Sequence, residues 1–211
     1  MKVWLALLVA IIMIFPNFGF AQEAGSFVGG FDLGITSATG DFRNDTLLDA
    51  NTGFGIGVEA SYYLFNGISI GPFLRYHRFG SGSQSSQGAI SYNFAEYGGD
   101  LRLNFMHIQN GKIYLMGAGG LFKPKSHLWT PDYTDEFSFQ SGTMFTAGLG
   151  ISSNRDAATI YSLEVRYNFG NADLKYVISG NTYTDNYKFD FIYILMKLSF
   201  NSKGIQPPPR Y

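Results

Sequence analysis

Apolar and polar residues alternate along several stretches of this chain, most regularly between residues 158 and 169. In that stretch Tyr161, Leu163 and Val165 occupy one set of positions, and Glu164 and Arg166 lie in the other set. A period of two is the period of a β-strand. The stretch therefore predicts a strand with one apolar face and one charged face.

The same alternation divides the rest of the chain into further strands. The predicted strands cover residues 26–36, 54–65, 68–79, 90–107, 112–122, 139–152, 158–169 and 188–200. The connections between them are alternately long and short, and Asn66-Gly67 forms a tight hairpin turn. Pro72 predicts a local irregularity in the third strand, because it has no N–H to donate. Residues 112–122 are apolar or glycine almost throughout, so the pattern assigns no faces to this strand.

Alternate long and short connections place all the long loops at one end of an up-and-down barrel. Either face of the strands could line such a barrel. A soluble barrel of the lipocalin kind would turn the apolar face inward. Its surface would then consist mainly of glycine and serine, whereas aromatic residues near both strand ends, Phe54 with Tyr62 and Tyr161 with Phe169, fit interfacial girdles. We therefore predict an all-β fold, an eight-stranded antiparallel up-and-down transmembrane β-barrel.

Composition agrees with a membrane barrel. Charged residues make up only 15% of the 211 residues, and aromatic residues make up 17%. The chain contains no cysteine, which excludes disulfides and thiolate chemistry. A net charge of -1 offers no footprint for nucleic acid, so no such partner is expected.

The N-terminus predicts export. Lys2 is followed by an apolar run over residues 3–15, and Gly19 and Ala21 fit a cleavage site after Ala21. We thus expect a signal peptide at residues 1–21, a barrel at 22–200 and a short periplasmic Pro-rich tail at 201–211.

If the charged faces point inward, the lumen collects five acids, four bases and a histidine. They are Asp32, Glu59, Glu96, Asp100, Glu164, Arg75, Arg102, Arg166, Lys197 and His77. An eight-stranded barrel leaves only enough room for side chains to fill, and buried charges are costly unless they are paired. The near-balance predicts a lumen closed by ion pairs, and the alternative is a narrow conduit for small or hydrophobic solutes.

The long loops carry aromatic residues of the type found at binding hot spots. These recognition candidates are Trp129, Tyr133, Phe137, Tyr176, Tyr183 and Tyr187. His127 has no second ligand at metal spacing, and the acidic first loop lacks the spacing of a calcium loop, so neither a metal nor another cofactor is expected.

The alternation and the final strand ending in Phe200 resemble the small eight-stranded outer-membrane barrels of the OmpX and OmpA-barrel type. The resemblance implies a monomer in the outer membrane of a double-membraned bacterium, surrounded by lipid and lipopolysaccharide. It further implies a structural or surface-interaction role in which the loops bind an extracellular ligand or protein. A lipid A-modifying enzyme is a second alternative, because His107-Ile108-Gln109-Asn110 is similar to the His-x-Ser-Asn motif of such deacylases. Gln109 stands where the nucleophile belongs, so we expect no enzyme.

Overall fold

The computed structural model describes residues 24–44, 49–65, 67–81, 89–108, 111–129, 134–153, 159–178 and 181–202. The predicted signal peptide and all but the first two residues of the Pro-rich tail lie outside the described residues, so these boundaries remain predictions. No helix in the described ranges has the length and hydropathy needed to cross a membrane.

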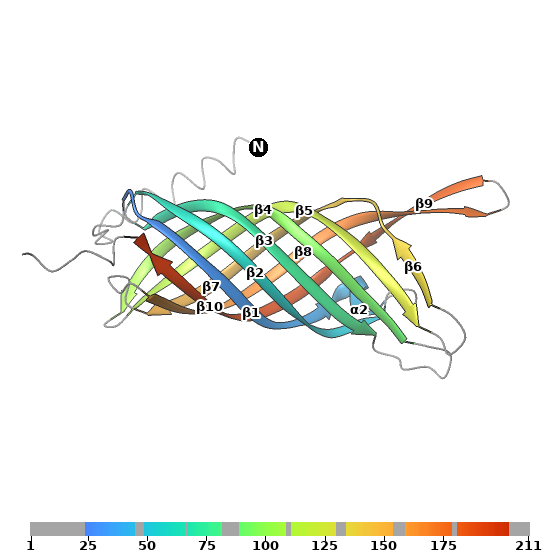
Figure 1. Cartoon of the computed structure of the whole chain (residues 1–211), viewed down its shortest axis with the longest axis horizontal. Coiled ribbons are helices and arrows are strands. Elements are labelled where there is room, and N and C mark those ends of the chain that lie inside the picture. Colours follow the sequence, from blue (N-terminus) through green and yellow to red (C-terminus); the bar gives the residue numbers. More distant parts are fainter. Residues whose placement is uncertain are drawn as a thin grey trace, which may run out of the picture.

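The described chain forms one antiparallel sheet with a short helix (Figure 1). Its elements are β1 (Phe27–Thr39), α2 (Gly40–Asn44), β2 (Ala50–Phe65), β3 (Ile68–Ser81), β4 (Ala89–Ile108), β5 (Gly111–Trp129), β6 (Thr134–Ser138), β7 (Gly142–Ser153), β8 (Thr159–Ile178), β9 (Asn181–Lys188) and β10 (Asp190–Asn201). Eight strands close into a ring in the order β1-β2-β3-β4-β5-β7-β8-β10, and β10 pairs back to β1. The predicted eight-stranded antiparallel up-and-down transmembrane barrel is confirmed.

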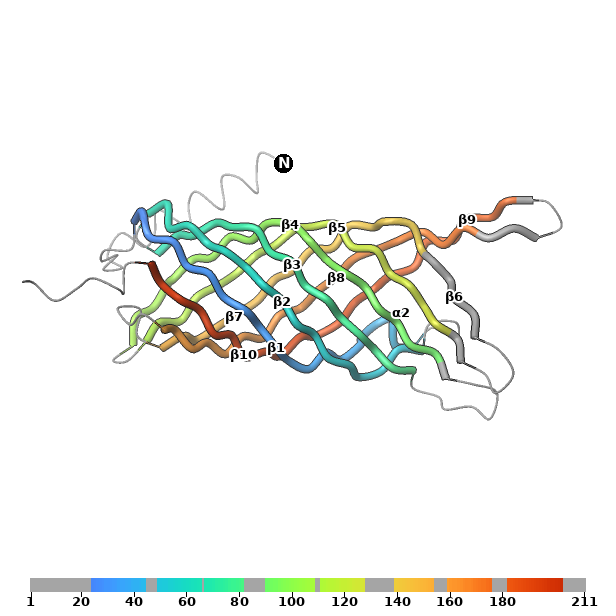
Figure 2. The backbone as a smooth tube through the Cα atoms, in the orientation of Figure 1, coloured from blue at the N-terminus to red at the C-terminus, as the bar shows by residue number. Residues whose placement is uncertain are grey.

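The two ends of the barrel differ. At one end, which we call the turn end, β1 begins beside the end of β10, with Val28 paired to Asn201, and Gly67 supports the β2–β3 turn with a positive φ of 85°. At the other, the hairpin end, strands extend past the ring (Figure 2). All the long connections lie at the hairpin end, as the alternation of loop lengths predicts.

The predicted long loops are wrong in one respect, because they contain regular structure. β5 continues to Trp129 and pairs with β6, and β8 continues to Ile178 and pairs with β9. The first loop holds α2. Residues 182–186 of β9 are exposed on both faces, so they show no apolar alternation by which the sequence could reveal this strand.

The barrel exterior is apolar. Side chains such as Leu33, Phe145, Val165 and Met196 are exposed, while their neighbours along the strand are buried in the lumen. This arrangement reverses the polarity of a soluble protein, and it suits hydrocarbon outside a closed sheet that leaves no backbone edge unpaired.

Two details of the strands could be settled only by the structure. In β5, Lys112, Tyr114 and Phe122 point into the lumen, and Leu115 and Leu121 point outward. The irregularity expected at Pro72 is confined to the ladder with β2, in which Gly71 and Pro72 have no paired residue. The register to β2 is the same on either side of this gap, and Pro72 pairs in register with Gly99 of β4. A fixed φ near that of an extended chain lets proline occupy a strand at the loss of one ladder hydrogen bond.

Candidate functional site

The barrel lumen is filled by side chains in three successive layers. Nearest the turn end lies a polar chamber lined by residues such as Ser61, Tyr63 and Lys112. The middle of the barrel holds charged side chains, which we call the ionic layer. The hairpin end is packed with aromatic rings, which we call the aromatic layer. All three layers arise from inward-facing positions of the same strands.

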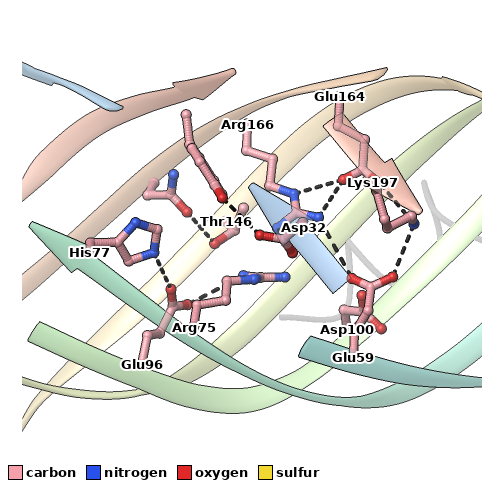
Figure 3. A network of polar contacts seen from close by, with 12 residues as sticks. Asp32, Glu59, Arg75, His77, Glu96, Asp100, Thr146, Glu164, Arg166 and Lys197 are labelled. Carbon is pink, nitrogen blue, oxygen red and sulfur yellow. Dashed lines mark hydrogen bonds and ion pairs between the residues drawn. The ribbon is translucent and has the colours of Figure 1, made fainter. Parts of the chain in front are cut away.

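Glu164 of β8 is one centre of the ionic layer. Its carboxylate lies 2.5 Å from Arg166 Nη2 and 2.9 Å from Lys197 Nζ (Figure 3). The Tyr114 hydroxyl donates a further hydrogen bond of 2.5 Å to the same carboxylate. Glu164 and Arg166 are fully buried, so each charge is stabilised by its partners and not by water.

Glu59 of β2 is the second centre. Its carboxylate lies 2.5 Å from Arg102 Nη2 and 3.0 Å from Lys197 Nζ. Arg102 also lies 2.8 Å from Asp100 of its own strand. Lys197 therefore joins the two centres, because it contacts both Glu59 and Glu164.

Arg166 extends the ionic layer toward β1. Its guanidinium lies 3.5 Å from Asp32 and 3.6 Å from Glu59. The Tyr193 hydroxyl donates a hydrogen bond of 2.7 Å to Asp32. Asp32 is thus held by a cation and by a neutral donor.

A separate group of charges lies toward the aromatic layer. Glu96 of β4 is 3.6 Å from Arg75 and 3.5 Å from His77, both on β3 (Figure 3). The His77 ring contacts the rings of Phe94, Phe191 and Tyr193. This group forms the boundary between the ionic and the aromatic layer.

The structure places all ten candidate lumen residues inside the barrel and buries each of them. It adds Lys112, which sequence reasoning missed because the faces of residues 112–122 were not assigned. Lys112 is buried and donates a hydrogen bond of 3.1 Å to the Tyr63 hydroxyl. With it the described lumen holds five carboxylate side chains and five lysine or arginine side chains.

Inward-facing glycines make room for the large charged side chains. A Cβ at Gly57 would lie 2.9 Å from both carboxylate oxygens of Asp32 and 3.0 Å from Cγ of Arg75. A Cβ at Gly55 would lie 2.7 Å from His77 Nδ1. These distances are shorter than ordinary van der Waals contact, so the space left by Gly55 and Gly57 is taken up by ionisable side chains of neighbouring strands.

The aromatic layer closes the hairpin end of the lumen. Phe79, Phe94, Phe122 and Phe191 come from barrel strands and are almost fully buried. Their ring centroids lie between 5.2 and 5.6 Å apart where they contact, which is typical of packed aromatic pairs. The sequence pattern predicted charges and small polar residues inside the barrel and missed this layer.

Three further aromatic rings cover this layer from above, and each comes from a break in the strands. Phe42 lies on α2, Phe139 lies between β6 and β7, and Phe189 lies between β9 and β10. Phe189 contacts Phe42 at 5.1 Å and Phe139 at 5.3 Å between ring centroids. Three of the long connections therefore each turn one aromatic residue inward to cover the lumen.

Two of the recognition candidates, Tyr176 and Tyr183, are paired in register between β8 and β9. Tyr183 is exposed on β9, whereas Tyr187 is half-buried and packs against the Phe139 ring at 5.7 Å. Trp129, Phe137 and Tyr176 lie in β5, β6 and β8, but their side chains are outside the described part. Tyr133 lies wholly outside the described residues.

Neither a metal site nor the enzyme motif is supported by the described residues. No group of three or more His, Asp or Glu within them has the arrangement of a metal site. His107 is exposed near the turn-end terminus of β4, and Gln109 lies outside the described residues. His127 lies on β5 and is half-buried.

No family model and no curated protein matches the chain. Similar solved structures include Ail, the attachment invasion locus protein of Yersinia pestis, at 13% identity and a TM-score of 0.48, over 84% of this chain and 99% of that one. Neisserial surface protein A aligns at 12% identity and a TM-score of 0.49, over 85% and 99%. OprG from Pseudomonas aeruginosa aligns at 14% identity and a TM-score of 0.48, over 86% and 98%. The ring of eight strands and its apolar exterior define a small barrel of the outer-membrane type, and the resemblance predicted from the sequence is confirmed at the level of the fold.

Proposed function

We propose that this chain is an outer-membrane protein with a largely closed lumen that acts as a structural or surface-interaction protein and not as an enzyme. The layered filling of the lumen is the observation that carries the proposal. A solute would have to pass the aromatic rings of Phe42, Phe139 and Phe189 and then the ion pairs around Glu59 and Glu164.

The ionic layer is costly to open. Breaking a buried pair by moving one partner leaves an uncompensated charge, at a cost of about 3–5 kcal/mol. Glu164 contacts Arg166 and Lys197, and Arg166 also contacts Asp32. Displacement of either side chain therefore deprives more than one buried charge of an ion-pair partner. A steady aqueous path through this layer would need several such displacements at once.

The hairpin end supplies the exposed surface for interaction. β8 and β9 form a hairpin that projects beyond the ring (Figure 1), and Thr182, Tyr183, Thr184 and Asp185 on β9 are exposed. A rigid barrel that presents a structured hairpin suits recognition of an extracellular ligand or protein.

Trimming this hairpin tests the surface-interaction role. A variant in which residues 174–185 are replaced by a short turn keeps the barrel portion of β8, because that portion pairs with β7 and β10 over residues 159–171. Cells that display the trimmed protein should lose adhesion, complement binding or phage sensitivity conferred by the full chain. A variant with Thr182 and Thr184 replaced by serine is the matched control. Unchanged behaviour of the trimmed variant in all three assays would contradict the role.

The conduit alternative predicts a different result. Rings in the aromatic layer would suit an apolar solute, but the ionic layer lies directly beneath them. Single-channel conductance separates the two functions, because a conduit predicts large, steady currents and a closed lumen predicts at most brief, small steps.

A further inference from the structure

The strands β3 and β5, which flank β4, carry a group of cations on the outside of the barrel, immediately past its apolar belt. The last full apolar row across β3, β4 and β5 consists of Leu74, Tyr97 and Leu121, which are paired in register. The next outward-facing row is Tyr76, Ala95 and Lys123, and the one after it is Arg78, Asn93 and Lys125. We call Arg78, Lys123 and Lys125 the basic patch.

The three cations of the basic patch are exposed. Lys123 and Lys125 follow each other on one face of β5, and Arg78 is two strands away across Asn93. Neighbouring strands are about 4.8 Å apart, so the Cα atoms of Arg78 and Lys125 are about 10 Å apart. Long side chains from all three positions can thus reach one group of atoms the size of a phosphate.

The other barrel strands end their apolar belt differently. Beyond Ile35, Phe54 and Phe145 the next outward-facing residues are Ser37, Thr52 and Thr143. Beyond Phe169 and Ile192 they are Asn171 and Asp190. Within the described part of the chain, basic residues directly follow the belt on β3 and β5 and not on these five strands, so the patch marks one side of the barrel.

We propose that the basic patch binds the phosphate groups of lipid A in the outer leaflet. Its place fits this ligand: the apolar rows below it face acyl chains, and the first charged rows above them lie at headgroup depth. Arg supplies paired donors to phosphate oxygens, Lys supplies point charges, and Asn93 between them adds an amide donor. The inference rests on the proposed outer-membrane location, with the hairpin end outside.

Lipid retention by the purified full chain tests the proposal. The protein is folded in a non-ionic detergent and titrated with diphosphoryl lipid A or with lipid A from which both phosphates have been removed, and native mass spectrometry measures the bound fraction. The wild type should prefer the phosphorylated lipid, and added salt should weaken the preference. The triple variant Arg78→Gln, Lys123→Gln, Lys125→Gln should lower that preference by about 100-fold, at about fivefold for each charge removed.

Two further variants make the result specific. Arg43→Gln, Lys175→Gln, Lys188→Gln also removes three exposed cations, but from α2, β8 and β9, and it should keep the preference. The swap Arg78→Lys, Lys123→Arg, Lys125→Arg keeps the charges and should also keep it. Equal binding of the two lipids by the wild type, or an unchanged preference in the folded triple glutamine variant, would overturn the proposal. A wild-type chain that fails to fold in detergent or lipid would instead contradict the membrane barrel itself.

Discussion

Arg102 and Glu59 form an ion pair of 2.5 Å although their strands, β4 and β2, are separated in the ring by β3. Lys197 of β10 similarly contacts Glu59 across β1, at 3.0 Å. These pairs do not follow the wall of the barrel from one strand to the next. They cross part of the lumen, which is why a small number of side chains suffices to fill it.

Loss of Glu164 should destabilise the barrel strongly. Glu164→Leu leaves Arg166 and Lys197 buried without their shared carboxylate, and the free energy of unfolding should fall by about 3–5 kcal/mol. Urea titration in lipid vesicles, followed by circular dichroism, measures the change. Asp41→Asn is the control, since its pair with Lys188 is exposed and should contribute less than about 1 kcal/mol. Equal effects of the two substitutions would show that the ionic layer contributes no more than a surface pair.

Gly57→Ala should also lower stability, because the added Cβ meets the Asp32 carboxylate at 2.9 Å. Overpacking of this kind costs about 1–3 kcal/mol. Gly29→Ala is the matched change on a neighbouring strand, where a Cβ has no neighbour within 4 Å, and it should leave stability unchanged or slightly raised. The same urea titration compares them. A Gly57→Ala barrel as stable as the wild type would mean that the lumen is less tightly filled than the structure indicates.

A charge on the apolar exterior should impair membrane insertion. Val165 lies at the centre of the exposed row on β8, and Val165→Arg places a cation in hydrocarbon. Such a change at the bilayer midplane costs about 2–4 kcal/mol, whereas one near the interface costs much less. Thr184→Arg on β9 lies beyond the ring and should be neutral. Folding yield into phosphatidylcholine vesicles, read from the heat-dependent gel shift, gives the comparison, and equal yields would contradict the orientation of the strands.

Phe189 should be essential to the cover over the aromatic layer. Its ring contacts Phe42, Phe122 and Phe139, and Phe189→Ala should cost about 3–5 kcal/mol through the cavity it leaves. Phe145→Ala removes a ring of the same size from the lipid-facing exterior and should cost clearly less, because lipid chains can fill the space. Unfolding in vesicles again provides the measurement. A larger loss of stability for Phe145→Ala than for Phe189→Ala would contradict the prediction, because the exterior ring would then contribute more to packing than the ring that covers the lumen.

The sequence predicted the barrel well where the two faces of a strand differ in chemistry. In β8, Glu164 and Arg166 alternate with Leu163 and Val165, so the period of two was visible. In β5 the inward Tyr114 and Met116 are as apolar as the outward Leu115, and the faces could not be told apart. Lys112 was missed for this reason.

The cover over the aromatic layer escaped prediction for a different reason. Phe42, Phe139 and Phe189 lie at breaks between strands, where no periodicity indicates direction. Their inward orientation depends on where the chain bends relative to the ring, which is a tertiary property. The strand β9 was likewise invisible, because residues 182–186 are exposed on both faces.

Single-channel recording tests the central claim, the closed lumen, most directly. The chain from residue 22 onward, folded in detergent and inserted into planar bilayers in about 1 M salt, is expected to give no steady open level and at most brief, small current steps, because eight strands leave no room beyond their own side chains. The variant Glu164→Leu serves as a comparison, since a weakened ionic layer should raise the frequency of such steps. Large, steady currents through the wild-type protein would contradict the account.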